Sequence, residues 1–116
     1  RGEGFCLPAL EGGVHGRTCI ITGWSGHMDF VGQGDDTYLL DVDRMVSRDD
    51  GGVGGGRWAE PSVDHLVELL RHVATHRDEA AERGRRFRTR LARDWTWELA
   101  ARRMIDALDG EAGGSA

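Results

Sequence analysis

Near its start the chain carries a glycine-rich turn that runs directly into a helix start, and this combination constrains the fold more than any other feature. Residues 2–11 read Gly2-Glu3-Gly4-Phe5-Cys6-Leu7-Pro8-Ala9-Leu10-Glu11. Proline is favoured in the first turn of a helix because its missing N–H would have no partner there. Glycine before that point lets the backbone come close to a ligand. The segment therefore predicts a tight turn followed by a helix that ends at Gly16.

A helix start of this kind favours a bound phosphate, because its unpaired N–H groups and the positive end of the helix dipole point at the anion. Glu11 lies about one turn, roughly 5 Å, into the helix, where its carboxylate can accept both hydrogens of a ribose diol. Glu3 precedes the helix and can reach the sugar side of a diphosphate. The other interpretation makes both glutamates solvent-exposed carboxylates. The Glu-x7-Glu spacing alone decides nothing, since Glu60 and Glu68 repeat it without a glycine turn.

The first half of the chain has the pattern of an α/β protein. Residues 18–22 and 37–42 are apolar, β-branched runs of strand length, and residues 23–31 between them predict a turn that leads into one helical turn. A helix between two strands is typical of parallel wiring. Residues 43–57 are rich in glycine and aspartate and predict a long loop.

The second half predicts three helices, with Ser62 and Thr96 as caps for the first and third. Apolar residues recur at helical spacing in each of them. The three faces consist of Val63, Leu66, Leu69, Leu70 and Val73, then Ala80, Gly84, Phe87, Leu91 and Trp95, and finally Trp97, Ala101, Met104, Ile105 and Leu108. Residues 110–116 predict a disordered tail, which leaves one domain over residues 1–109.

The first motif resembles the Glu-x7-Glu motif of the retaining family 4 glycosyltransferases, in their carboxyl-terminal, donor-binding domain. The likeness continues through Gly16, residues 19–30, residues 58–61 and the closing helices. It implies a partial Rossmann-like parallel sheet with flanking helices, the later part of the second domain of a two-domain enzyme. The family usually has glycine where Cys6 stands.

By this resemblance the chain is part of a hexosyl-type transferase that binds a nucleotide-diphosphate-sugar and passes the sugar to an acceptor hydroxyl with retention of configuration. Glu3 is then the catalytic residue near the donor sugar, and Glu11 binds the ribose. The remaining donor-binding positions are Gly2, Gly4, Phe5, Cys6 and Leu7. No metal or other cofactor is implied. The sugar, lipid-linked or small-molecule acceptor would bind a domain upstream, so we expect the segment alone to be inactive.

Two other functions fit the same residues. One is a non-catalytic nucleotide-binding or regulatory domain on the same scaffold. The other is a glycosidase with Glu3 and Glu11 as its two carboxyl groups, which requires a separation of roughly 5 to 10 Å.

Charge and composition limit the classes of partner and the cellular location that the sequence favours. Twenty acidic residues outnumber fifteen basic ones, which disfavours nucleic-acid binding. The sequence has no run of about eighteen apolar residues that could span a membrane. The two cysteines, Cys6 and Cys19, form no zinc or disulfide pattern. A reducing, cytoplasmic location is expected.

Two clusters in the helical half allow more than one interpretation. Six arginines between Arg83 and Arg93 indicate a solvated helix face, or alternatively contact with an anionic membrane surface at its inner side. The histidines at positions 65, 72 and 76 share one stripe of a helix, with the last two at the spacing of metal ligands. Because no acidic or cysteine ligand joins them on that stripe, a polar helix edge is the favoured interpretation.

Overall fold

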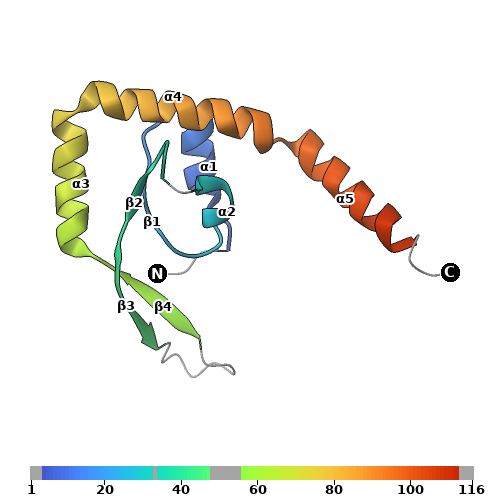
Figure 1. Ribbon diagram of the computed structural model, residues 1–116, viewed down its shortest axis with the longest axis horizontal. Helices are drawn as coiled ribbons and strands as arrows, with labels where there is room; N and C mark the ends of the chain where they lie inside the picture. Colours follow the sequence, from blue (N-terminus) through green and yellow to red (C-terminus); the bar gives the residue numbers. More distant parts are fainter. Residues whose placement is uncertain (1–3, 33, 48–55, 113–116) are drawn as a thin grey trace.

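A short parallel pair of strands lies at the centre of the computed structural model, which describes residues 4–32, 34–47 and 56–112 (Figure 1). Strand β1 (Ile20–Thr22) pairs with β2 (Tyr38–Leu40), with Ile20 opposite Tyr38 and Thr22 opposite Leu40. Parallel strands need a crossover connection, and the one-turn helix α2 (Met28–Val31) lies on it. The predicted strand-helix-strand order and the mixed α/β class are confirmed.

The predicted loop over residues 43–57 is wrong at both of its ends. Strand β3 (Val42–Ser47) pairs in the antiparallel sense with β4 (Arg57–Pro61). The register shifts between Val42 and Arg44, and a bulge of this kind breaks the alternation of inward and outward side chains. The sequence therefore shows no strand periodicity in β3. The part of the predicted loop at residues 48–55 lies outside the described residues.

Helix α1 (Leu7–Val14) packs on helix α4 (Arg77–Asp94), and together with α2 they enclose the core. Phe30 and Val31 of α2 and Phe87 and Leu91 of α4 form the buried cluster. The face predicted for the second long helix is confirmed, since its members Ala80, Gly84, Phe87 and Leu91 are all buried.

Two glycines allow α1 and α4 to approach closely. A Cβ on Gly13 would stand 2.4 Å from a ring carbon of Phe87, and a Cβ on Gly84 would stand 2.4 Å from the carbonyl oxygen of Gly16. Gly16 itself has a φ of +69°, which suits the predicted end of α1 because glycine adopts this conformation without strain. The glycines that weaken these helices locally are required by their packing.

Helix α3 (Val63–Thr75) precedes α4 and meets it at His76 (Figure 1). The predicted cap is confirmed, because the His65 backbone N–H donates to Ser62 Oγ at 3.4 Å. Within the part of the chain that the structure describes, no three His, Cys, Asp or Glu side chains form a group suited to a metal ion. His72 instead lies 2.9 Å from a carboxylate oxygen of Glu79, and this hydrogen bond lowers the pKa of Glu79.

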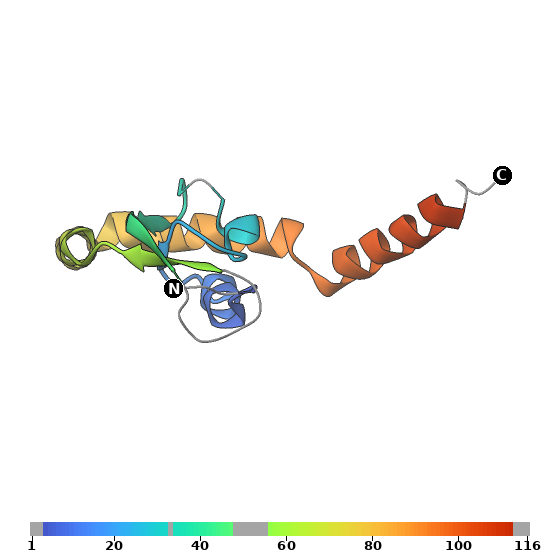
Figure 2. The ribbon, with the colours of Figure 1, turned by 90° about the horizontal axis from the view of Figure 1, so that it is seen from below.

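Helix α5 (Trp97–Ala112) extends away from the rest of the protein (Figures 1 and 2). Its predicted cap is confirmed by a bond from the Leu99 N–H to Thr96 Oγ1 at 3.2 Å. The helix continues through Gly110 to Ala112, so the predicted disordered tail is wrong for residues 110–112, and residues 113–116 lie outside the described part. No helix among the described residues is both long and apolar enough to cross a membrane.

The predicted apolar face of α5 is present but uncovered. Trp97 is 90% exposed and Met104 is 67% exposed, and Ile105 and Leu108 are also exposed. The helical spacing identified a face correctly, whereas the contacts of that face could not be read from it.

Candidate functional site

The turn that enters α1 adopts a backbone conformation that non-glycine residues rarely accept. Cys6, the residue before the helix, has φ 63° and ψ 62°. This left-handed conformation costs a residue with a Cβ about 1 to 2 kcal/mol. Pro8 lies in the first turn of the helix, as the sequence predicts. A strained non-glycine residue at the entrance of a helix is a feature that often accompanies a binding site.

The helix start offers backbone N–H groups to a ligand. The N–H groups of Ala9 and Leu10 both turn inward to the Cys6 carbonyl, at 3.1 and 3.4 Å. Among the described residues, the N–H groups of Phe5, Cys6 and Leu7 donate to no backbone carbonyl. Leu7 is 52% exposed and Phe5 is 39% exposed. These donors and the positive end of the helix dipole are the groups with which the sequence predicts that an anion is bound.

The turn is held in place by an aromatic contact. The Phe5 ring lies 5.1 Å from the Phe30 ring and 6.0 Å from the Trp95 ring, between centroids. Phe30 is fully buried, so Phe5 anchors the turn to the core between α2 and α4. The sequence assigned Phe5 a role through its backbone, and its anchoring side chain was not predicted, because the pairing partners lie 25 and 90 residues away (Phe30 and Trp95).

The remaining predicted residues divide into those that the structure describes and those that it does not. Glu11 is exposed on α1. Gly4 is exposed, and no atom outside its immediate chain neighbours lies within 4 Å of where a Cβ on it would stand. The Gly4 backbone is therefore uncovered on that side. Gly2 and the catalytic candidate Glu3 lie outside the described residues, so their positions relative to Glu11 stay predictions.

The α1 start lies at the same end of the protein as the carboxyl end of β1. Figure 1 shows α1 and β1 running in opposite directions, with the start of α1 and the end of β1 toward the same side of the view. The contact between Phe5 and Phe30 of α2 agrees with this, because α2 follows β1. In open α/β sheets, ligands bind outside the carboxyl ends of parallel strands. The predicted phosphate site at the α1 start stays a prediction, and this is the edge on which such a site is expected.

The segment after β1 contains a buried histidine that the sequence did not single out as structural. His27 is 5% exposed, and its Nε2 lies 2.7 Å from the carbonyl oxygen of Thr22. Ser25, two residues earlier, has a φ of 95°. The hydrogen bond ties the turn to the end of β1. This bond gives His27 a positioning role in the turn.

No protein-family model matches the chain, and a search of curated proteins finds no match. The assignment of function therefore rests on the residues and their geometry.

The strain at Cys6 leads to a first prediction. The substitution Cys6→Gly removes the Cβ from a left-handed residue, so we expect it to raise the free energy of unfolding by about 0.5 to 1 kcal/mol. Because the backbone near a phosphate then becomes more accessible, affinity for a nucleotide should be maintained or improved. Urea denaturation and calorimetry measure the two effects. A clear loss of affinity would show that the Cys6 thiol makes a contact of its own with the ligand.

Proposed function

We propose that this chain forms part of the nucleotide-sugar-binding site of a retaining glycosyltransferase, on a Rossmann-like α/β scaffold. The observation that carries the proposal is the left-handed turn at Cys6, which leads into a helix with proline in its first turn. The start of this helix lies toward the same side of the protein as the end of the parallel strand β1. A helix start near the carboxyl ends of parallel strands supports this proposal, because α/β proteins bind diphosphates there with backbone N–H groups and a helix dipole. The resemblance to family 4 glycosyltransferases is consistent with it.

Each donor group has a proposed partner. The diphosphate lies against the N–H groups of Phe5, Cys6 and Leu7, and Glu11 accepts hydrogen bonds from the ribose diol. Glu3 is the proposed contact of the transferred sugar. The departing diphosphate gains negative charge in the transition state, and donors that are already oriented stabilise that charge. The proposal requires no metal ion, because the helix start supplies the positive potential.

The proposed reaction also requires an acceptor. Transfer with retention needs the acceptor hydroxyl on the same face of the sugar as the departing diphosphate, and holding the two in place lowers the barrier. We propose a sugar, a lipid-linked molecule or a small molecule as the acceptor, bound by a separate part of the complete enzyme.

The Glu11 contact gives the decisive experiment. We expect Glu11→Ala to weaken binding of a nucleoside diphosphate or nucleotide-sugar about tenfold, because about 1.4 kcal/mol of hydrogen bonding to the ribose is lost. Glu68→Ala is the matched control, since Glu68 is an exposed helix carboxylate at the end of the second Glu-x7-Glu pair. Affinities measured by calorimetry should change less than about twofold for this control.

A 2′-deoxy nucleotide makes the test specific for the ribose. The original chain should bind this analogue more weakly than the ribonucleotide, whereas Glu11→Ala should bind the two equally. If Glu11→Ala still discriminates between them, Glu11 does not hold the ribose and the proposed donor site is wrong.

A non-catalytic nucleotide-binding domain is the second candidate, and the side chain of Cys6 at a position suited to glycine favours it. The two candidate functions differ in how much the sugar contributes to binding affinity. A transferase should bind the nucleotide-sugar more tightly than the free nucleoside diphosphate for one sugar of a panel. A regulatory domain should bind all members of the panel equally.

A further inference from the structure

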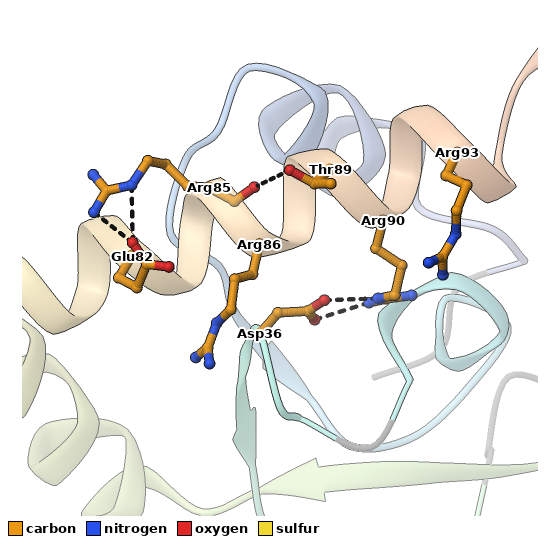
Figure 3. A pocket seen from close by; sticks show the side chains of 7 residues that line it. All are labelled: Asp36, Glu82, Arg85, Arg86, Thr89, Arg90 and Arg93. Carbon is orange, nitrogen blue, oxygen red and sulfur yellow. Dashed lines mark hydrogen bonds and ion pairs between the residues drawn. The ribbon is translucent and has the colours of Figure 1, made fainter.

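A hollow of about 410 Å³ lies along α4, on a part of the chain that the proposed donor site does not use. Four arginines and two carboxylates contribute to its lining, so basic groups are in excess. Figure 3 shows Arg86, Arg90 and Arg93 projecting to one side of α4, with Arg90 directed at Asp36. None of the described residues of α1 or of the turn before it lines the hollow. We propose that this hollow binds the phosphate group of a second ligand, separate from the nucleotide-sugar.

Arg90 lines the hollow and is held in place by its hydrogen bonds. Its Nε and one terminal nitrogen bind the two carboxylate oxygens of Asp36 at 2.6 and 2.8 Å, and its terminal nitrogens also donate to the carbonyls of Phe30 and Val31. The bond to Asp36 raises the pKa of Arg90. All of these partners are fixed within the fold, so Arg90 holds Asp36 and neutralises its charge. The carboxylate therefore opposes a bound anion less than an unpaired one would.

Arg86 carries a positive charge that no carboxylate neutralises among the described residues. Its one described hydrogen bond goes from a terminal nitrogen to the carbonyl oxygen of Asp35, at 3.1 Å. The side chain is exposed and lines the hollow. Because a guanidinium has five N–H donors, Arg86 retains donors for a phosphate oxygen while it keeps the bond to Asp35.

Arg93 completes the site from two turns further along the helix. It pairs with its own neighbour Asp94, at 2.6 and 2.7 Å, and its side chain is 72% exposed. Exposed ion pairs of this kind contribute little to stability. Arg93 can therefore leave Asp94 and pair with a phosphate at a small cost in free energy. Arg86 and Arg93 are separated by about 10 Å along the helix axis, and a diphosphate or a phosphate with a further anionic group fits that span. Planar guanidinium groups suit phosphate oxygens because they can bind two of them at once.

The first test uses inorganic pyrophosphate as the probe and backbone amide shifts measured by NMR as the readout. Pyrophosphate should shift the amides of residues 86–93, and Arg86→Gln should weaken this binding about tenfold. Arg88→Gln is the matched control, because Arg88 is also an exposed arginine of α4 but does not line the hollow. It should change the affinity less than about twofold. Thermal unfolding of both variants verifies that each remains folded.

The second test distinguishes a free phosphate compound from a lipid headgroup. Binding to a membrane is measured by sedimentation with phosphatidylcholine vesicles, prepared with and without phosphatidylglycerol. Binding that requires phosphatidylglycerol and is lost in Arg86→Gln identifies a lipid headgroup as the source of the phosphate. Pyrophosphate binding without vesicle binding identifies a free ligand.

Two results would overturn the inference. One is that neither pyrophosphate nor anionic vesicles bind at residues 86–93. The other is that Arg88→Gln weakens binding as much as Arg86→Gln, which would indicate general attraction to a basic helix. Glu11→Ala should leave these amide shifts unchanged and affect only those of residues 4–11, so failure here is distinguishable from failure of the proposed donor site.

Discussion

Replacing Arg90 with alanine should lower the free energy of unfolding by about 3 kcal/mol. Arg90 joins α4 to Asp36 and to the carbonyls of Phe30 and Val31, and the Asp36 side chain is only 9% exposed. Removing the guanidinium leaves a buried carboxylate without its partner, which is costly in a medium of low dielectric constant. The Arg90 side chain is 27% exposed, so water can partly replace it, and the loss should lie at the low end of the range for buried pairs.

Arg93→Ala is the control for this prediction. It removes the same group from the same helix, but its pair with Asp94 is exposed, so the change should stay below about 1 kcal/mol. Urea denaturation followed by circular dichroism measures both variants. Equal, small losses would mean that the pair between Arg90 and Asp36 contributes no more than a surface ion pair.

The second large effect is expected for Gly84→Ala, which should destabilise the protein by about 2 kcal/mol. The added Cβ would stand 2.4 Å from the Gly16 carbonyl oxygen and 3.1 Å from its carbonyl carbon. These are backbone atoms at the end of α1, so the clash can be relieved only by separating α1 from α4. Alanine is a better helix former than glycine by about 1 kcal/mol, and this gain offsets part of the loss.

Gly12→Ala, in the helix that packs on α4, should have the opposite effect on stability. Nothing outside its own helix lies within 4 Å of a Cβ on Gly12, so the helix preference of alanine acts alone and should stabilise the protein by about 0.5 to 1 kcal/mol. Denaturant midpoints of the two variants should therefore move in opposite directions. A stabilised Gly84→Ala variant would contradict the close packing of α1 on α4.

The local structure around the α1 start was largely predictable because its features are local, whereas the donor site itself stays a proposal. A proline-started helix, a glycine-rich turn and Glu11 one turn later lie within ten residues of each other, and local hydrogen bonding and sterics decide their conformation. Two parts of the site were not predictable. The left-handed conformation of Cys6 contradicts the preference of its residue type, and the packing of Phe5 depends on Phe30 and Trp95.

The hollow on α4 shows that a pattern of charges in the sequence does not reveal which of the charged side chains are paired. The sequence shows arginines from Arg83 to Arg93, but it cannot separate Arg90, which is committed to Asp36, from Arg86, which has no carboxylate partner among the described residues. That distinction arises because residues 35 and 36 are brought against α4 by the crossover between β1 and β2.

The sequence by itself determined the helices, their caps at Ser62 and Thr96, and the order of the parallel strands, because periodicity and capping act over a few residues. Only the tertiary structure decided which faces are covered. The apolar stripe of α4 is buried by α1 and α2, while the equally regular stripe of α5 stays exposed. It also decided that β3 pairs with β4 despite a bulge that hides its periodicity. Burial and strand pairing depend on partners distant in sequence, and no local pattern specifies those partners.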